Sequence, residues 1–209
     1  YTSDNGKIIE PYDAGDFGAA KIISNTYDNG LGAIVFDKDV ISIGYDAFDE
    51  CYHLTSITIP DSVVEVLPGA FYNCYNLKEF KGCHASDDGH CLVIDGVLAA
   101  YAKASGTEYT IPNNVTEIGG CVFEKFYDLT HIDIPNSITK IGHMAFQSCS
   151  SLKSIIIPNS VTEIGNSAFY GCSGLKSSLT IPNSVTSIGE YAFQNCSLHS
   201  VTIGTGMLF

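Results

Sequence analysis

The side chains best suited to chemistry are concentrated in residues 83–91, Cys-His-Ala-Ser-Asp-Asp-Gly-His-Cys. Thiolate and imidazole groups are the usual ligands of zinc in proteins. The spacing matches no paired zinc-finger pattern, however, and Asp-Asp-Gly is typical of an exposed turn. Cys83 and Cys91 stand eight residues apart and could instead form a disulfide in an oxidising compartment, if their Cα atoms come close enough. The segment therefore predicts a polar loop, with a zinc site and a disulfide as the alternatives.

Five further cysteines occupy one position of a repeating pattern, namely Cys51, Cys74, Cys149, Cys172 and Cys196. Those in neighbouring repeats lie 23 or 24 residues apart. Catalytic or metal chemistry requires several thiolates at one point, whereas this recurrence distributes them along a stack of repeats. We therefore expect buried free thiols that pack as small apolar side chains.

The common catalytic patterns do not occur in the sequence. It contains no Gly-x-Ser-x-Gly, no His-Glu-x-x-His and no glycine-rich phosphate loop. Asparagines recur after the repeated prolines, but a calcium site would need more carboxylates at each turn. The sequence therefore predicts a protein that is not an enzyme and that has no cofactor and no resident metal.

An internal repeat must position all of these residues. Segments 129–146 and 152–169 share the text Leu-x-x-Ile-x-Ile-Pro-Asn-Ser-(Ile/Val)-Thr-x-Ile-Gly-x-x-Ala-Phe, 23 residues apart. Ile-Pro dipeptides mark the register, and steps of 23, 23 and 24 residues separate the last four. The step from Pro60 to Pro112 is 52 residues, which equals 23 plus 29, so one repeat is enlarged by about six residues.

Each repeat has the pattern of a short coil with one apolar side. Alternation in Leu-x-x-Ile-x-Ile predicts a strand, which Pro ends because it donates no hydrogen bond. The following Asn-Ser predicts a turn. After it, Val-Thr-x-Ile predicts a second extended segment, and Ala-Phe-x-x-Cys predicts about one helical turn. Only about 18 residues separate successive strands, too few for the helical crossovers of an ordinary α/β domain.

A single coil cannot bury its apolar side alone, so the coils must stack. The sequence therefore predicts a leucine-rich-repeat solenoid with a parallel β-sheet on one face and short helical turns and second extended segments opposite. Eight strand ranks are expected, near Ile34, Ile57, Phe80, Tyr109, Ile132, Ile155, Leu179 and Val201.

The first residues do not repeat, so residues 1–32 are predicted to form an N-terminal capping region and residues 33–209 the repeat array. Asn5-Gly6 and Asn29-Gly30 predict tight hairpin turns, which make the cap a β-hairpin structure. A solenoid needs such a cover because an open end exposes core and strand edges. The final strand has no visible cap, and we expect the native chain to continue past Phe209.

The enlarged repeat spans about residues 83–107 and contains its own hairpin signal. Asp95-Gly96 separates two apolar segments, residues 91–94 and 97–101. This hairpin either replaces one coil or forms a projecting lip that shapes a binding surface.

The repeat text resembles that of the BspA-like class of bacterial leucine-rich-repeat surface proteins. It is complete at residues 157–172, nearly complete at 181–196, and recognisable over about 33–204. The resemblance implies a secreted or surface-anchored protein of a class associated with adhesion to host matrix proteins and other cells. Cys121-Val-Phe replaces x-Ala-Phe, and Phe126 stands where Cys is expected, so a uniform surface is in doubt. The class defines no catalytic or binding residues that could be carried over.

Composition excludes several partners. The net charge of −13, from 10 basic and 23 acidic residues, would repel nucleic acid and anionic membranes. No apolar run approaches the ~20 residues of a transmembrane helix. The opening Tyr-Thr-Ser-Asp is neither basic nor apolar, so this chain shows no signal peptide, which gives no reason to expect a cytoplasmic protein.

Outward-facing strand positions are the candidate partner-binding face. They alternate with the inward Ile residues, and the mixed charges near the enlarged repeat make the middle of the array its most distinctive part. The candidates are Ser56, Thr58, Glu79, Lys81, Glu108, Thr110, His131, Asp133, Ser154 and Ile156. The sequence thus predicts a non-catalytic, extracellular or cell-surface adhesion module that binds a protein or glycan, including host matrix proteins; the alternative is a structural spacer in a larger surface protein.

Overall fold

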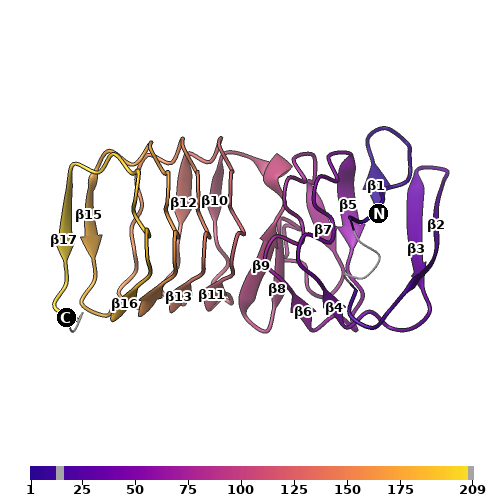
Figure 1. Cartoon of the computed structure of the whole chain (residues 1–209), viewed down its shortest axis with the longest axis horizontal. Helices are drawn as coiled ribbons and strands as arrows, with labels where there is room; N and C mark the ends of the chain where they lie inside the picture. Colours follow the sequence, from indigo (N-terminus) through magenta and orange to yellow (C-terminus); the bar gives the residue numbers. More distant parts are fainter. Residues whose placement is uncertain (13–16, 207–209) are drawn as a thin grey trace. The chain divides into compact units, whose positions relative to one another are not determined.

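The computed structural model describes residues 1–12 and 17–206, which form a solenoid of stacked β-coils (Figure 1). The expected leucine-rich-repeat architecture is confirmed, with about 7 turns, ~23-residue repeats, parallel sheets and little helix. Residues 13–16 of the predicted cap and 207–209 of the predicted array lie outside the described residues.

The chain divides into two compact units inside the enlarged repeat. Unit 1 contains residues 1–95 and 99–105, and unit 2 contains residues 96–98 and 106–209. The division into a capping region and a repeat array remains a prediction.

The strands are short, and most recur once per repeat. Unit 1 contains β1 (Thr2–Ser3), β2 (Ile22–Asp28), β3 (Leu31–Phe36), β4 (Ser42–Ile43), β5 (Leu54–Thr58), β6 (Glu65–Val66), β7 (Glu79–Lys81), β8 (Cys91–Ile94) and the 3-10 helix η1 (Lys103–Ser105). Strand β9 (Val97–Tyr101) is divided between the units. Unit 2 contains β10 (Glu108–Thr110), β11 (Glu117–Ile118), β12 (His131–Asp133), β13 (Lys140–Ile141), β14 (Glu163–Ile164), β15 (Ser178–Ile181), β16 (Ser187–Ile188) and β17 (Ser200–Ile203).

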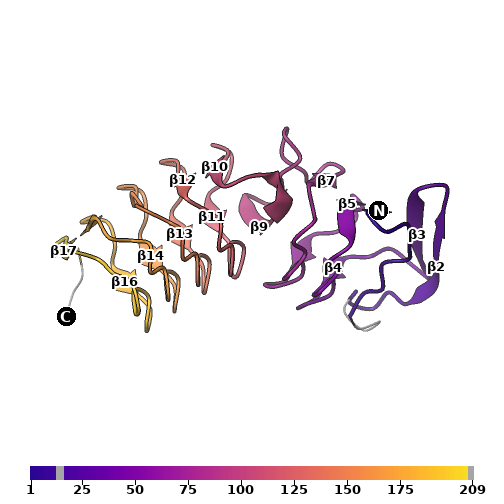
Figure 2. The same ribbon diagram turned by 90° about the horizontal axis from the view of Figure 1, so that it is seen from above.

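Three sets of backbone hydrogen bonds join the coils of unit 2. On one side, β10 pairs in parallel with β12, and β15 with β17, each one repeat apart. The second extended segments form a parallel ladder in the order β9-β11-β13-β14-β16. At the turns, each coil donates N–H groups to the next, as from Phe146 N to Ala168 O at 2.8 Å. Figure 2 shows these coils following one another in the stack.

The predicted rank near Ile155 differs from its neighbours because residues 152–157 form no strand. Leu152, Ile155 and Ile157 still point into the core and are buried. The inward alternation predicted from sequence therefore holds at this rank, but the sheet is interrupted between β12 and β15.

The Ala-Phe-x-x-Cys segments form tight turns rather than the expected helical turn. Cys149 N donates to Phe146 O at 3.2 Å, across three residues. Met144, directly before this segment, and Ser148, within it, have φ values of 53° and 60°, and a left-handed residue cannot continue a right-handed helix. The chain therefore turns a sharp corner and leaves its amide groups free to bond to adjacent coils.

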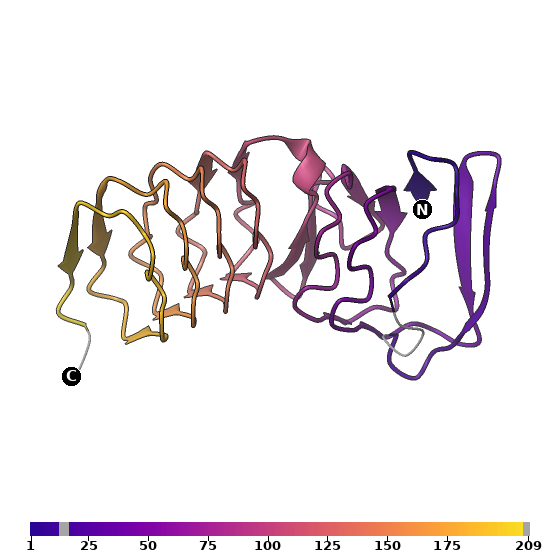
Figure 3. The same cartoon turned by 45° about the horizontal axis from the view of Figure 1, so that its top comes forward.

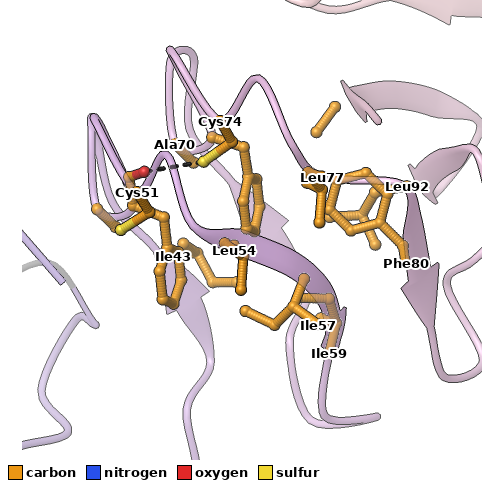
Figure 4. Close-up of a cluster of buried hydrophobic side chains, with 14 of the residues drawn as sticks. Ile43, Cys51, Leu54, Ile57, Ile59, Ala70, Cys74, Leu77, Phe80 and Leu92 are labelled. Carbon is orange, nitrogen blue, oxygen red and sulfur yellow. Dashed lines mark hydrogen bonds between the residues drawn. The ribbon is translucent and has the colours of Figure 1, made fainter. Parts of the chain in front are cut away.

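Buried side chains form columns through both units. In unit 2, Phe123, Phe146, Phe169 and Phe193 stack with ring centroids 5.0 to 5.2 Å apart and planes within 4°. Figure 4 shows the corresponding interior of unit 1, where residues from successive coils meet side by side. These columns confirm that successive coils bury the same repeat positions against one another.

The N-terminal segment does not form the hairpin predicted at Asn5-Gly6. Strand β1 instead pairs antiparallel with β5, with Thr2 opposite Ser56 and Ser3 opposite Leu54. The prediction was wrong because the side chain of Asn5 accepts the Lys7 amide at 3.0 Å and turns the chain away, so local turn chemistry does not lead into a second strand.

The second predicted hairpin, at Asn29-Gly30, is confirmed. Strands β2 and β3 pair antiparallel, and the two turn residues have φ values of 48° and 85°, as a tight hairpin turn requires. The rank near Ile34 is nevertheless not paired with the rank near Ile57, because β1 separates them: Tyr1 exchanges hydrogen bonds with Gly32 at 2.9 and 3.0 Å.

The hairpin predicted at Asp95-Gly96 is also confirmed, with strands at the expected residues 91–94 and 97–101. Val97 and Leu98 pair in parallel with β11, where a coil would place its second extended segment. Most side chains of β8 and β9 are buried. These contacts favour a hairpin that replaces part of a coil over a projecting lip.

Candidate functional site

In unit 1, the predicted face consists of side chains from β5 and β7. The parallel register places Ser56 beside Glu79 and Thr58 beside Lys81. Lys81 Nζ lies 2.9 Å from Glu79 Oε1, and both side chains are about half exposed. This part of the face therefore presents an exposed ion pair next to a threonine.

Ser56 does not belong to the exposed face, which corrects one predicted site residue. Only 5% of its surface is exposed, because Thr2 covers it. The Thr2 Oγ1 atom lies 2.7 Å from Ser56 Oγ and 2.6 Å from Thr55 Oγ1. The repeat pattern gave the outward direction correctly, but it carries no information about a strand that arrives from the distant N-terminal segment.

In unit 2, β10 and β12 bring four predicted site residues together. Glu108 lies opposite His131, and Thr110 lies opposite Asp133. Asp133 accepts a hydrogen bond from Thr110 Oγ1 at 3.0 Å, and its other carboxylate oxygen lies 3.1 Å from His131 Nε2. All four side chains are exposed, and the polar groups of Thr110, His131 and Asp133 hold one another in place.

Ser154 and Ile156 lie on the same predicted face, at the interrupted rank. Both are exposed, and 82% of the Ile156 surface is accessible. Ile156 borders a surface hollow of about 390 Å³ whose other walls include Pro158 and Thr180. A single exposed apolar side chain is ordinary on a protein surface, so it is the adjoining hollow that makes Ile156 a candidate anchor for a partner.

The segment at residues 83–91 has the geometry of a polar loop. His90 Nδ1 lies 3.4 Å from Asp88 Oδ2. Cys83 is exposed and Cys91 is buried, and no disulfide joins them. A hydrogen bond to the Asp61 carboxylate raises the pKa of Cys83. Within residues 1–12 and 17–206, no three His, Cys, Asp or Glu side chains are placed to hold one metal ion.

The cysteine column points into the core, and four of its five thiols are buried, with Cys196 partly exposed. Each of the last four donates to a backbone carbonyl of the preceding coil, as from Cys74 Sγ to Phe48 O and Cys172 Sγ to Phe146 O, both at 3.0 Å (Figure 4 draws the first). Burial raises the pKa of Cys51 to about 12 and that of Cys74 further. The reactive thiolate is therefore disfavoured in this column.

One further cavity was not predicted from the sequence. It lies in unit 1 between β3 and β5, has a volume of about 240 Å³, and is lined mainly by apolar side chains. No repeat position signals it, because it depends on where β1 inserts. Among the described residues, no helix has the length and apolar character needed to cross a membrane.

Stacked coils with a shared apolar interior define this protein as a leucine-rich-repeat solenoid. The family model for the BspA type leucine rich repeat region matches residues 21–84 and 98–208 in six copies. The chain belongs to the BspA-type leucine-rich-repeat family, which confirms the resemblance seen in its repeats.

Solved structures similar to this chain include bacterial cell-surface proteins. A leucine rich cell surface protein from Faecalibacterium prausnitzii is 26% identical, with a TM-score of 0.53, over 78% of this chain and 57% of its own. The pneumococcal vaccine antigen PcpA is 25% identical, with a TM-score of 0.61, over 74% and 40%. A leucine-rich repeat protein from Bacteroides ovatus, 24% identical with a TM-score of 0.53 over 85% and 56%, shows the fold alone.

The chain spans about half the length of these solved relatives, at 57%, 40% and 56%. Curated protein sequences contain no match to it. The family includes bacterial cell-surface proteins.

Proposed function

We propose that this protein is a non-catalytic adhesion module that acts outside the cell or on its surface and binds a protein or glycan through its exposed strand face. The observation that carries the proposal is the exposed Ile156, which borders a hollow in unit 2. Apolar anchors surrounded by polar groups contribute most of the energy of many protein interfaces.

The polar cluster on β10 and β12 supports the same proposal. Because Asp133 is hydrogen-bonded to Thr110 and lies near His131, these side chains lose little conformational freedom when a partner binds. The net charge of −13 favours a neutral or basic partner. Cell-surface relatives support an extracellular location.

The test is a binding array of extracellular-matrix proteins and glycans, probed with the wild-type chain and with Ile156→Ser. We expect saturable binding to at least one member of the array and an affinity at least tenfold lower for the variant, because truncating an anchor residue costs about 2 kcal/mol or more and tenfold corresponds to about 1.4 kcal/mol. Val64→Ser is the matched control, since Val64 is also an exposed aliphatic residue at 61% but belongs to unit 1. Absence of binding at about 10 µM would contradict the proposal.

A structural spacer is the second candidate function. The regular ladders and the stacked phenylalanine column of unit 2 favour a spacer. Each coil contacts only the coils next to it, so adding or removing whole repeats changes the length of the stack without disturbing the other coils. The test is to display the protein on a cell surface and delete one 23-residue repeat away from the binding face. If the protein is an adhesion module, ligand binding should be unchanged. If it is a spacer, the distance between the cell surface and the displayed end should become shorter.

A further inference from the structure

The hollow beside Ile156 lies where one wall of unit 2 changes its repeat length. The step from Ile132 to Ile155 is 23 residues, whereas the step from Ile155 to Leu179 is 24. The extra residue follows Leu175, where Leu-Lys-Ser-Ser-Leu replaces the usual Leu-x-x-Ile. One extra residue in a strand shifts its register and disrupts the ladder locally. Figure 3 shows the coil between β12 and β15 without a strand arrow on this wall.

Close contacts between the coils bound the hollow on both sides along the chain. Before it, Gly174 lies so near the preceding coil that a Cβ atom would stand 2.5 Å from Ser150 O and 2.7 Å from Leu152 O. After it, Thr186 N donates to Thr162 O at 2.9 Å. The hollow is therefore a local opening in one wall of the stack, and the coils of unit 2 remain in contact on either side of it.

Backbone groups in this opening have no backbone partner. Among the residues that the structure describes, no amide of residues 154–157 donates to a backbone carbonyl, and no carbonyl of these residues accepts a backbone amide. At the same place in a regular coil, Ile111 N donates to Asp133 O at 3.0 Å. Peptide groups that are not paired within a protein must bond to water or to a ligand. Residues 155–157 line the hollow, so it offers backbone donors and acceptors to a bound molecule.

The side chains around the hollow are polar or aliphatic, and none of its lining residues is charged. The polar side chains are the amides of Asn136 and Asn159 and the hydroxyls of Ser178 and Thr180. Amide and hydroxyl groups each donate and accept hydrogen bonds. The other lining residues are isoleucines and prolines. A ligand of this site is therefore neutral, rich in hydrogen-bonding groups, and apolar on one side.

We propose that this hollow, named the sheet hollow, binds a neutral oligosaccharide. The inference rests on the proposed function and specifies the class of its ligand. Sugar hydroxyls donate and accept, so they can pair with the backbone groups of residues 155–157 and with the Asn, Ser and Thr side chains. The C–H groups of a sugar ring can cover Ile156 and Pro182. The volume of about 390 Å³ is in the range of small-molecule sites, about 300–1,000 Å³.

The same backbone groups disfavour an apolar side chain of a protein partner as the occupant. Such a side chain would exclude water from the N–H and C=O groups of residues 155–157 without bonding to them, and burying unpaired polar groups costs free energy. A charged side chain would find no opposite charge in the lining. A hydroxyl-rich ligand meets both conditions.

The first test measures binding of four neutral disaccharides, lactose, maltose, cellobiose and chitobiose, by isothermal titration calorimetry. We expect at least one to bind with a Kd of about 1 mM or lower. Its sulfated derivative should bind at least tenfold more weakly, because the protein has a net charge of −13 and the lining has no cation. No binding up to about 10 mM, or equally tight binding of the sulfated sugar, would overturn the proposal.

The second test removes single polar groups from the lining. Thr180→Val keeps the side-chain shape but lacks the hydroxyl, and Asn159→Ala lacks the amide; each should weaken binding of the best disaccharide at least threefold. Thr202→Val and Asn113→Ala are matched controls, because these residues occupy the same repeat positions outside the hollow. Their affinities should equal that of wild type. Unchanged affinity in both lining variants would place the sugar elsewhere.

The third test closes the hollow by restoring the repeat length. Deleting Ser177 returns the step from Ile155 to the next strand to 23 residues, so the coils can pair. We expect Tm to stay equal or rise and disaccharide affinity to fall at least tenfold. Ser177→Ala, which keeps the length, is the control and should bind as wild type does. A folded deletion variant with wild-type affinity would overturn the proposal, and the Thr180→Val result decides if the deletion variant does not fold.

A final comparison separates this inference from the adhesion role on which it rests. A matrix glycoprotein bound by the array assay is tested again after enzymatic removal of its glycans, and with the best disaccharide as competitor. We expect binding to be lost in the first case and inhibited in the second. Binding that persists in both, yet weakens in Ile156→Ser, would retain the adhesion role and overturn the sugar site. Disaccharide binding without binding to any array member would support the sheet hollow and contradict the adhesion role.

Discussion

Unit 2 repeats one coil with little variation, whereas unit 1 interrupts the same coil design with a strand from the N-terminal segment. The aromatic packing records the difference. Phe146 and Phe169 stack with planes 4° apart, while Phe17 meets Phe36 and Phe48 at 59° and 70°. Where the repeat is regular, each side chain packs against the same residue type in the next coil. Where the repeat is interrupted, unlike side chains meet and pack less completely.

The largest expected effect tests that difference in packing. Phe146→Ala removes a ring with no exposed surface from the middle of the column, and should lower the free energy of unfolding by about 3–5 kcal/mol. Phe48→Ala, which lines the cavity between β3 and β5, should cost less, because its surroundings are already partly empty. Urea denaturation followed by circular dichroism measures both. Equal losses of stability would show that this cavity does not weaken the packing of the core in unit 1.

A smaller effect concerns how closely coils approach each other. A Cβ atom on Gly165 would lie 2.7 Å from backbone atoms of Gly142 and His143, so Gly165→Ala must separate two coils at an expected cost of about 1–3 kcal/mol. In unit 1, a Cβ on Gly32 would meet the Tyr1 ring, which can move away. Gly32→Ala should therefore cost less stability while releasing β1, which hydrogen exchange at Thr2 and Ser56 detects. A larger Tm loss in Gly32→Ala than in Gly165→Ala would reverse the comparison.

The cysteine column is a feature that both units share, and it predicts a dependence of stability on pH. Burial raises the pKa of Cys74, and a hydrogen bond with Cys149 raises that of Cys172. An unfolded thiol titrates near 8.5. The unfolded state therefore loses protons that the folded state keeps, so stability is complete below about pH 8.5 and falls as pH rises above it.

Each fully buried thiol is expected to contribute a decline of up to about 1.4 kcal/mol per pH unit above that point. Denaturation at pH 8, 9 and 10 should give a shallower slope in Cys74→Ala and in Cys172→Ala. Thr186→Ala, which removes an exposed hydroxyl, is a control that should leave the slope unchanged. A slope that is the same in all variants would show that the column does not titrate in this way.

The smallest expected effect compares surface ion pairs. Lys140 lies between Glu117 and Glu163, at 3.7 and 3.8 Å, on the ladder of unit 2, whereas Lys81 in unit 1 contacts Glu79. Exposed pairs contribute about 0–1 kcal/mol, so Lys81→Ala should change stability by less than about 0.5 kcal/mol and Lys140→Ala by slightly more. At 1 M salt the two variants should lose the same amount of stability, because salt screens exposed charges. If the stability losses of the two variants still differ at 1 M salt, the difference comes from packing and not from charge.

Sequence predicted what depends on repeated local chemistry and missed what depends on distant contacts. The recurring Ile-Pro-Asn-Ser text was sufficient for the coil and its inward columns, and Asn29-Gly30 and Asp95-Gly96 marked two hairpins because their positive φ values suit those residue types. Ser56 was assigned to the exposed face because nothing in the repeat indicates that Thr2 covers it.

The corners of the coils were missed for a different reason. Met144 and Ser148 adopt positive φ, although neither residue type favours that region. Their conformation is imposed by the stack, because the amides of both donate to the following coil. A pattern of apolar spacing cannot distinguish such a corner from one turn of helix.

Those corner hydrogen bonds also have a common direction. Cys121, Phe123 and Lys125 donate to the coil that follows, and so do the corresponding residues of the next coils. Their peptide dipoles therefore add along the wall, as they do within a helix, although this part of unit 2 contains none. Within residues 121–194 the positive end of each peptide dipole points toward the later coil, so a carboxylate is stabilised near the later coils of this segment and an ammonium group near its earlier coils.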